Sequence, residues 1–331
     1  MKKIKTFLVF GTRPEAIKMA PLIKELQARQ EFECIVCVTA QHRQMLDQVL
    51  SFFNITPQYD LNIMKDRQTL DSITRNVLEL LTPILREEKP DIVLVHGDTT
   101  TSFAGALAAF YEKIAIGHVE AGLRTWDKYS PFPEEANRQM VDCLSDMFFA
   151  PTEKSASNLR NEGKTTGIYI TGNTAIDALK STVFEEYHHP ILSEHKNNRI
   201  LLLTAHRREN LGKPMEDIFT AVKRIVNEYN DVSVIYPIHM NPAVREIADR
   251  ILCGHERIQV IEPLEVSDFH NFIAHSYLVL TDSGGIQEEA PSLGKPVLVL
   301  RDTTERPEGV ECGTLKLIGT NSEDIYSNIK L

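Results

Sequence analysis

The chain has 331 residues, of which 42% are hydrophobic and 25% are charged, and its formal net charge at pH 7 is −10. This length favours two domains over one ordinary core, and the composition is that of a soluble globular protein. The net negative charge argues against a nucleic-acid-binding surface, so any anionic ligand must be held by local basic side chains and backbone N–H groups.

The first residues and the cysteines both favour a cytoplasmic protein. The opening "MKKIKTFLVFG" begins with basic residues, but its apolar run is too short for a signal peptide and is better used as a strand. No stretch approaches transmembrane length. The chain has five cysteines, and Cys34 and Cys37 form a C-x-x-C inside a strand-like segment, where alternation sends the two side chains to opposite faces. We therefore expect core thiols in a reducing compartment rather than a zinc site.

Short β-branched segments alternate with longer amphipathic ones through the first half of the chain. This alternation predicts a parallel sheet covered by helices on both faces. Helices are expected at 14–29, 42–53, 68–88, 99–111 and 134–144. Strands are expected at 6–10, 34–39, 91–96, 114–119, 147–151 and 167–171.

The pattern weakens at 172–198 and then restarts. "NTAIDALKSTV" looks helical, whereas "EEYHHPILSEHKNN" is polar, contains a proline and is typical of a linker with solvent-exposed histidines (His188, His189 and His195). The sequence thus predicts an N-terminal Rossmann-like domain at 1–171, a connecting helix and linker at 172–198, and a C-terminal Rossmann-like domain at 199–331. Strands of the second domain are expected at 199–204, 232–238, 258–263, 277–282 and 296–300.

Unusual polar residues follow the strands of both domains. Seven junctions show this pattern: "GTRPE", "HGDTTT", "EAGLRT", "AHRREN", "HMNP", "EPLE" and "DSGGIQEEA". Because ligands of open parallel sheets bind beyond the carboxyl ends of the strands, these junctions predict a central cleft that the two sheets face.

Two junctions have the features of anion-binding sites. In "GTRPEAIKM", a helix N-terminus would lie beside Arg13 and Lys18, which suits phosphate oxygens; the alternative is a surface salt bridge with Glu15 or Glu25. In "TDSGGIQEEAPSLGKP", the amides at 283–285 would receive a phosphate and Glu289 would accept from sugar hydroxyls; the alternative is a plain glycine-rich helix start. Neither stretch is G-x-G-x-x-G, which disfavours a nicotinamide cofactor.

Three carboxylates are candidates for proton transfer, and each has a structural alternative. Asp98 could instead cap the following helix, Glu120 could pair with Arg124, and Glu134 could be a first-turn acid favoured by the helix dipole.

Histidines add further titratable groups to the predicted cleft. Together with His206 and His239, the three carboxylates form a set suited to removing and returning a proton near neutral pH. A metal site built from Asp98, His118, Glu120, His206 and His239 is the minor alternative, since no helical H-x-x-x-H pair supports it.

The longest motifs carry a resemblance to a known family. The segments "FGTRPEAIKMAPL", "LVHGDTTT", "GHVEAGLRT", "SPFPEEANRQ", "TAHRREN" and "TDSGGIQEEAPSLGKPVLVLRDTTERPE" closely resemble the bacterial non-hydrolysing UDP-N-acetylglucosamine 2-epimerases, and the likeness covers essentially the whole chain. The resemblance implies a glycosyltransferase-B-like architecture, a homodimer, and no metal or nicotinamide cofactor. It also implies a role in cell-envelope polysaccharide biosynthesis. Relative to the family pattern, this chain stops at Leu331, before the final C-terminal helices.

The same resemblance implies a reaction and a set of site residues. UDP would leave the anomeric carbon as the proton on carbon 2 is removed, giving 2-acetamidoglucal, and proton return and UDP re-addition would complete the inversion. The implied catalytic residues are Asp98, Glu120, Glu134 and His206. The implied UDP-binding and sugar-binding residues are Arg13, Lys18, His239, Leu264, Phe269, Ser283, Gly284, Gly285, Glu289 and Arg306.

Some members of that family bind a second UDP-N-acetylglucosamine as an activator. The positions that resemble this activator site are Gln41, Gln44, Arg67, Glu134, Arg207 and His239. Three other functions would use a similar fold: a hydrolysing epimerase, a glycosyltransferase with an acceptor groove, and a catalytically silent nucleotide-sugar sensor. The carboxylates argue against the sensor, because unneeded acids near a diphosphate would weaken binding.

Overall fold

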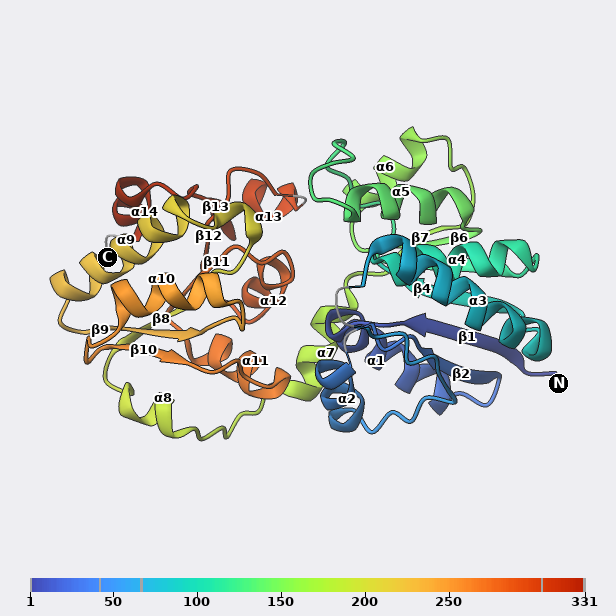
Figure 1. Ribbon diagram of the computed structural model, residues 1–331, viewed down its shortest axis with the longest axis horizontal. Coiled ribbons are helices and arrows are strands. Elements are labelled where there is room, and N and C mark those ends of the chain that lie inside the picture. Colours follow the sequence, from blue (N-terminus) through green and yellow to red (C-terminus); the bar gives the residue numbers. More distant parts are fainter. Residues whose placement is uncertain (1, 42, 66–67, 305, 330–331) are drawn as a thin grey trace. The chain divides into compact units, whose positions relative to one another are not determined.

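The chain folds into two compact units, which are described here one at a time. A computed structural model describes residues 2–41, 43–65, 68–304 and 306–329. Unit 1 is Met1–Ala178 and unit 2 is Leu179–Leu331. In Figure 1 unit 1 runs from blue to green and unit 2 from yellow-green to red. Within the described ranges, no helix has the length and apolar character needed to cross a bilayer.

The described part of unit 1 contains a seven-stranded parallel sheet with strand order β3-β2-β1-β4-β5-β6-β7. Its strands are β1 (Ile4–Phe10), β2 (Phe32–Val38), β3 (Tyr59–Asp60), β4 (Ile92–His96), β5 (Ala115–Val119), β6 (Met147–Ala150) and β7 (Ile168–Ile170). Its helices are α1 (Arg13–Ala28), α2 (Arg43–Phe52), α3 (Leu70–Glu88), α4 (Thr100–Tyr111), α5 (Glu134–Leu144), α6 (Glu153–Asn161) and α7 (Thr174–Thr182), the last of which crosses the boundary between the units.

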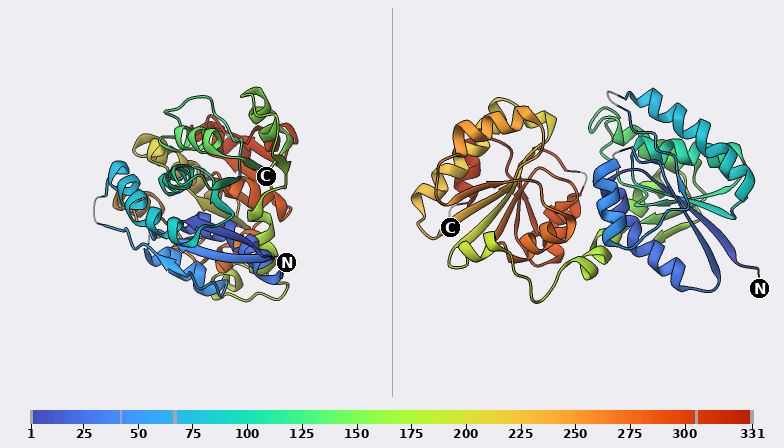
Figure 2. Two further views of the ribbon diagram at one scale, coloured as in Figure 1. Left: turned by 90° about the vertical axis from the view of Figure 1, so that its right-hand side faces the viewer. Right: turned by 60° about the horizontal axis from the view of Figure 1, so that its bottom comes forward.

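The core of unit 1 follows from the alternation of its strands and the apolar stripes of its helices. Phe7 and Val9 of β1 pack against α3, α4 and α5, whereas Leu8 and Phe10 point to the other face of the sheet. Helix α3 places Ile73, Val77, Leu81 and Leu85 at helical spacing in this core. Figure 1 shows α3 beside α4, and Figure 2 (right) shows helices on both faces of each sheet.

The described part of unit 2 repeats this plan with a six-stranded parallel sheet of order β10-β9-β8-β11-β12-β13. Its strands are β8 (Arg199–Thr204), β9 (Val232–Pro237), β10 (Ile258–Ile261), β11 (Leu278–Thr281), β12 (Val297–Val299) and β13 (Leu315–Leu317). Its helices are α8 (Pro190–Glu194), α9 (Lys213–Glu228), α10 (Pro242–Leu252), α11 (Val266–His275), α12 (Ile286–Ser292), α13 (Pro307–Glu311) and α14 (Ser322–Ile329), with a short 3-10 turn, η1 (Arg208–Asn210).

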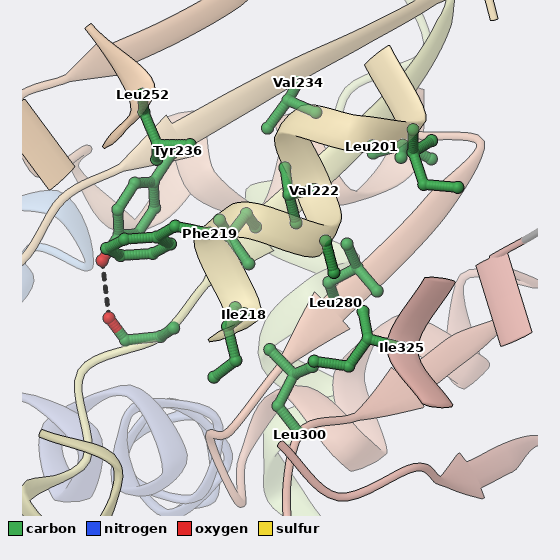
Figure 3. Packing of buried hydrophobic residues seen from close by; sticks show 14 of the residues in the cluster. Leu201, Ile218, Phe219, Val222, Val234, Tyr236, Leu252, Leu280, Leu300 and Ile325 are labelled. Carbon is green, nitrogen blue, oxygen red and sulfur yellow. Dashed lines mark hydrogen bonds between the residues drawn. The ribbon is translucent and has the colours of Figure 1, made fainter. Parts of the chain in front are cut away.

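Two apolar layers enclose the sheet of unit 2. One layer joins α9, α10 and α14 to the sheet through residues such as Phe219, Val222 and Ile325, which Figure 3 shows around Leu201 and Leu280. The other layer joins α11 and α12 to the opposite face. Burial of this kind stabilises by about 1.5–3 kcal/mol for each large apolar side chain.

The predicted fold class is confirmed, with a few local differences. Both units are parallel α/β sheets, as the alternating pattern indicated. The two-residue strand β3, the three-residue strand β13 and the helix α8 inside the predicted linker were not expected, because each is too short to produce a periodic signal. His195 is buried rather than exposed, so the expectation for that histidine was wrong.

The expectation of core thiols holds for only part of the cysteine set. All five cysteines are free; Cys37 is buried, Cys34 is half-buried, and Cys143, Cys253 and Cys312 are exposed. Position along β2 (Phe32–Val38) accounts for the difference between the first two, because burial begins at Ile35 on both faces and Cys34 lies before that point.

Each sheet has a point at which the strand order reverses direction. In unit 1 this point lies between β1 and β4, and in unit 2 it lies between β8 and β11. Loops that leave neighbouring strands there diverge to opposite faces, which opens a crevice at the carboxyl end of the sheet. The turns at 11–15, 97–99, 205–210 and 282–285 all follow strands at these points.

Candidate functional site

The turn after β1 is organised by a buried carboxylate. Glu15 Oε2 accepts hydrogen bonds from the N–H groups of Gly11 (3.0 Å) and Thr12 (2.8 Å). Its other oxygen accepts from the hydroxyls of Thr99 (2.7 Å) and Ser102 (2.8 Å) on α4. Burial raises the pKa of Glu15, and the hydrogen bonds oppose this rise. Glu15 therefore joins the start of α1 to the start of α4.

Gly11 is required by close packing. A Cβ atom at Gly11 would lie 1.9 Å from Thr39 Oγ1 and 2.8 Å from Thr101 Oγ1, so both side chains would have to move to admit it. The backbone at Gly11 therefore approaches Thr39 more closely than any other residue type would permit.

Lys18 and Glu120 form a buried ion pair with each other. Their side chains are 10% and 8% exposed, and the Lys18 ammonium donates to Glu120 Oε1. The sequence suggested instead a surface salt bridge from Arg13 or Lys18 to Glu15 or Glu25, but the observed Lys18 pair is buried and joins Glu120, and Arg124 pairs with Asp142 and Glu162. The order of the strands explains this pairing. Strands β1 and β5 are both neighbours of β4, so the residues that follow β5 lie near the first turns of α1, which follows β1.

A buried histidine, His96, lies beside the candidate carboxylate Glu120. His96 Nε2 is 3.8 Å from Glu120 Oε2, and the charges of Glu120 and Asp98 both act on its ring. Burial outweighs them and lowers the pKa of His96 to about 4, so the ring is neutral at neutral pH. Sequence reasoning did not single out His96, although it directly precedes the "GD" of "HGDTTT".

Asp98 is held by two side chains of α5. Arg138 Nη2 donates to Asp98 Oδ2 (2.6 Å), and Asn137 Nδ2 donates to the Asp98 carbonyl (2.9 Å). The residue that caps α4 is Thr99, whose hydroxyl accepts from the N–H of Ser102 (3.1 Å), so the capping alternative for Asp98 is wrong. Sequence reasoning did not identify Arg138. It lies four residues after the candidate Glu134 on the same helix, and this spacing was the signal that could have found it.

The remaining residues predicted in unit 1 occupy the starts of helices. Arg13 is the first residue of α1 and is half-buried, and Glu134 is the first residue of α5, as its structural alternative predicted. Gln41 Oε1 accepts from Thr101 Oγ1 (3.0 Å). Gln44 belongs to α2; its side chain and all of Arg67 lie outside the described part of the chain.

In unit 2, Asp282 organises the loop after β8. Asp282 Oδ2 accepts from the N–H groups of His206 (2.8 Å) and Arg207 (2.8 Å) and from Asn210 Nδ2 (3.1 Å). Asp282 Oδ1 lies 3.5 Å from His206 Nδ1. The rings of His206 and His239 stack, with centroids 5.3 Å apart and planes 10° apart. Burial and then the His206 charge lower the pKa of His239.

One of the phosphate donors predicted in the glycine-rich turn after β11 has a partner within the protein. The N–H of Ser283 already donates to Thr281 Oγ1 (2.9 Å), which leaves the Ser283 hydroxyl and the amides of Gly284 and Gly285 as candidates. Glu289 lies one turn further on, with Oε2 at 3.7 Å from His270 Nε2.

The other residues of unit 2 that were predicted to bind the substrate precede or follow this turn in the sequence. Arg306 Nε is 3.0 Å from Glu288 Oε2. Leu264 and Phe269 are partly buried and pack against the apolar layer that contains α11 and α12. Within the described ranges, no group of three or more His, Cys, Asp or Glu side chains is arranged to hold a metal ion.

Comparison with known proteins identifies the family. The model of a family described as UDP-N-acetylglucosamine 2-epimerase matches residues 24–331. The chain belongs to the UDP-N-acetylglucosamine 2-epimerase family. A Bacillus subtilis UDP-N-acetylglucosamine 2-epimerase is 63% identical over 331 residues, which is 100% of this chain and 87% of that epimerase. The expectation of an isomerase that acts as an epimerase is confirmed by this membership.

Two solved structures of epimerase relatives contain nucleotide ligands. One is described as an S. aureus MnaA–UDP co-structure; it is 59% identical, has a TM-score of 0.93, and is matched over 100% of this chain and 87% of that chain. The other is UDP-GlcNAc 2-epimerase from Neisseria meningitidis bound to UDP-GlcNAc; it is 50% identical, has a TM-score of 0.93, and is matched over 98% and 90% of the two chains.

Proposed function

We propose that this epimerase interconverts UDP-N-acetylglucosamine and UDP-N-acetylmannosamine by eliminating UDP to 2-acetamidoglucal and adding it back. The observation that carries the proposal is the arrangement in unit 1, where Glu120 lies 3.8 Å from the buried ring of His96 and the charge of Asp98 also acts on that ring. His96 ends β4 and Asp98 follows it, beside the point where the sheet order reverses, and Glu120 follows the neighbouring strand β5. Proton removal at carbon 2 and proton return need acid–base groups of this kind.

The two units would contribute complementary groups to substrate binding. Arg13 and Lys18 of unit 1, with the Ser283 hydroxyl and the amides of Gly284 and Gly285 in unit 2, would stabilise the leaving diphosphate. In addition, His239, Leu264, Phe269, Glu289 and Arg306 would contact the nucleotide and sugar. Proton transfer would be shared among Asp98, Glu120, Glu134 and His206.

An isotope experiment tests this mechanism. UDP-N-acetylglucosamine is incubated with the enzyme in deuterated water and followed by NMR. We expect a mixture of two intact UDP-sugars that carry deuterium at carbon 2, because the removed proton exchanges before it returns. Free N-acetylmannosamine with UDP would instead identify a hydrolysing enzyme. Unchanged, unlabelled substrate would contradict the epimerase mechanism and favour a sensor or a transferase that lacks its acceptor.

We further propose that UDP-N-acetylglucosamine activates the enzyme at a second site. The candidate residues are Gln41, Gln44, Arg67, Glu134, Arg207 and His239. Side chains able to bind a second sugar nucleotide are present at every one of these positions. With UDP-N-acetylmannosamine alone we expect a lag that a trace of UDP-N-acetylglucosamine removes. Hyperbolic kinetics with no lag would contradict activation.

We also propose that the enzyme is a homodimer that serves cell-envelope polysaccharide synthesis, with residues 1–171 and 199–331 as its two functional domains. Light scattering of the purified chain measures its mass in solution directly. A mass close to 37.5 kDa, that of one chain, would contradict the dimer.

A further inference from the structure

A completely buried histidine has an acceptor at both ring nitrogens. The His118 side chain is 0% exposed. Its Nδ1 lies 2.6 Å from Asp142 Oδ1, and its Nε2 lies 2.8 Å from the carbonyl oxygen of Gly97. A carbonyl oxygen only accepts, so Nε2 must carry a hydrogen. The carboxylate at Nδ1 then decides whether the ring is neutral or charged.

The surroundings of Asp142 place the shared proton on the histidine. Asp142 Oδ2 accepts from Arg124 Nη2 (2.7 Å) and from the N–H of Gly122 (3.2 Å). Burial alone would raise the pKa of Asp142, but His118 and Arg124 together hold it below its ordinary value. The two donors Arg124 and Gly122 favour the ionised form of Asp142, which leaves the hydrogen between the two residues on His118 Nδ1.

A charge count of the network agrees with an imidazolium. Arg124 also donates from Nε (2.6 Å) and Nη2 (2.7 Å) to the two oxygens of Glu162. With His118 protonated, two cations face two anions, Asp142 and Glu162. Moving the hydrogen from His118 to Asp142 would leave this total unchanged, so the choice between the two forms depends on the bond from Arg124 to Asp142, which favours the ionised carboxylate.

This imidazolium holds the turn that presents the candidate proton-transfer carboxylate. Gly97 has a φ of +64°, and its N–H donates to Val119 O while its carbonyl accepts from His118. The next residue is Asp98, which Asn137 and Arg138 of α5 hold from the other side. Asp142 is also on α5, so one helix fixes the turn both directly and through His118.

We propose that His118, protonated and oriented by Asp142, is a positioning residue that sets the Gly97–Asp98 turn for proton transfer. This inference rests on the proposed function, because it assumes that Asp98 acts on the substrate. His118 itself is enclosed by protein and acts through the turn.

A spectroscopic experiment tests the charge state without reference to activity. In the full chain labelled with ¹⁵N-histidine, we expect both ring nitrogens of His118 to show protonated, imidazolium-type shifts at pH 7. In Asp142→Asn, the amide oxygen can keep the bonds from Gly122 and Arg124 while the amide NH₂ donates to His118 Nδ1. The variant should then show a neutral ring with hydrogen on Nε2 only. A neutral ring in the wild-type enzyme would overturn the proposal.

Kinetics test the positioning role. His118→Leu removes the donor to Gly97, and we expect kcat for epimerisation to fall about 100-fold, since a small misplacement of a reacting group has effects of this size. We expect KM and UDP affinity to change less than about threefold, and His118→Gln, which can still donate to the Gly97 carbonyl, to recover part of kcat. An unchanged kcat in His118→Leu would overturn the proposal.

Two further variants distinguish a failure of the positioning inference from a failure of the proposed function. His195→Leu replaces a buried histidine of unit 2 outside this network and should leave kcat unchanged, which controls for loss of a buried ring. If Asp98→Asn also retained full isotope exchange, the proposed function would have failed. If Asp98→Asn were inactive while His118→Leu was fully active, only the positioning inference would have failed.

Discussion

Asp98→Asn is expected to abolish deuterium incorporation at carbon 2 while leaving UDP affinity within about tenfold, or about 1.4 kcal/mol. The amide can still accept from Arg138 and so keep its position, but it cannot take up a proton. Loss of a general acid–base group lowers rates by about 10²–10⁴-fold. The measurement is NMR of the substrate in deuterated water, with UDP binding followed by calorimetry.

The same strand offers a matched control for this substitution. Asp91 directly precedes β4 and Asp98 follows it, so the two aspartates lie at opposite ends of one strand. Asp91 pairs with Lys2 and accepts from the N–H of Lys5 (2.8 Å), away from the carboxyl end of the sheet. Asp91→Asn should therefore exchange deuterium at the wild-type rate. Full exchange by Asp98→Asn would remove Asp98 from the mechanism.

Lys18→Met is expected to lower the free energy of unfolding of unit 1 by about 3–5 kcal/mol, because it removes the ammonium group that pairs with the buried carboxylate of Glu120. Glu120→Gln in the same chain should restore most of this loss, since the amide carries no charge. Urea titration followed by the fluorescence of Trp126, the chain's single tryptophan, measures the stability of unit 1.

The double variant also separates folding from chemistry. It should be stable but remain inactive, since the Glu120 carboxylate is absent. Lys24→Met, on the exposed side of the same helix, should change the free energy of unfolding by less than about 0.5 kcal/mol. Strict additivity of the Lys18 and Glu120 substitutions would show that the two side chains do not interact, contrary to the structure.

Periodicity predicted most of the fold because both sheets are parallel and buried on two faces. Their strands are short apolar runs, and the intervening helices have clear apolar stripes, as in α5, whose predicted and observed bounds are both 134–144. The elements that were missed, such as β3 and β13, have two or three residues and form only when they pair with β2 and β12, the strands that precede them.

Sequence reasoning singled out several polar residues of the candidate site, but it missed His96 and Arg138 and did not predict the partners of the residues that it named. Lys18 and Glu120 are separated by 102 positions, and only the order of the strands brings them together. Their pairing competes with the local partners that a sequence suggests first, at spacings of three or four residues. His118 was considered only as a metal ligand, and its true partner, Asp142, lies on the next helix along the chain.

The carboxylate of Glu15 has a consequence for how a phosphate group can be recognised in unit 1. In many nucleotide-binding proteins the backbone N–H groups of the first turn bind the phosphate, so charged side chains contribute less to its binding. Here the N–H groups of Gly11 and Thr12 are already occupied by Glu15. An anion that approaches this turn would find these two N–H groups occupied and would depend more on cationic side chains. Arg13 would then decide affinity, and replacing it with glycine would not convert the turn into a phosphate-wrapping loop.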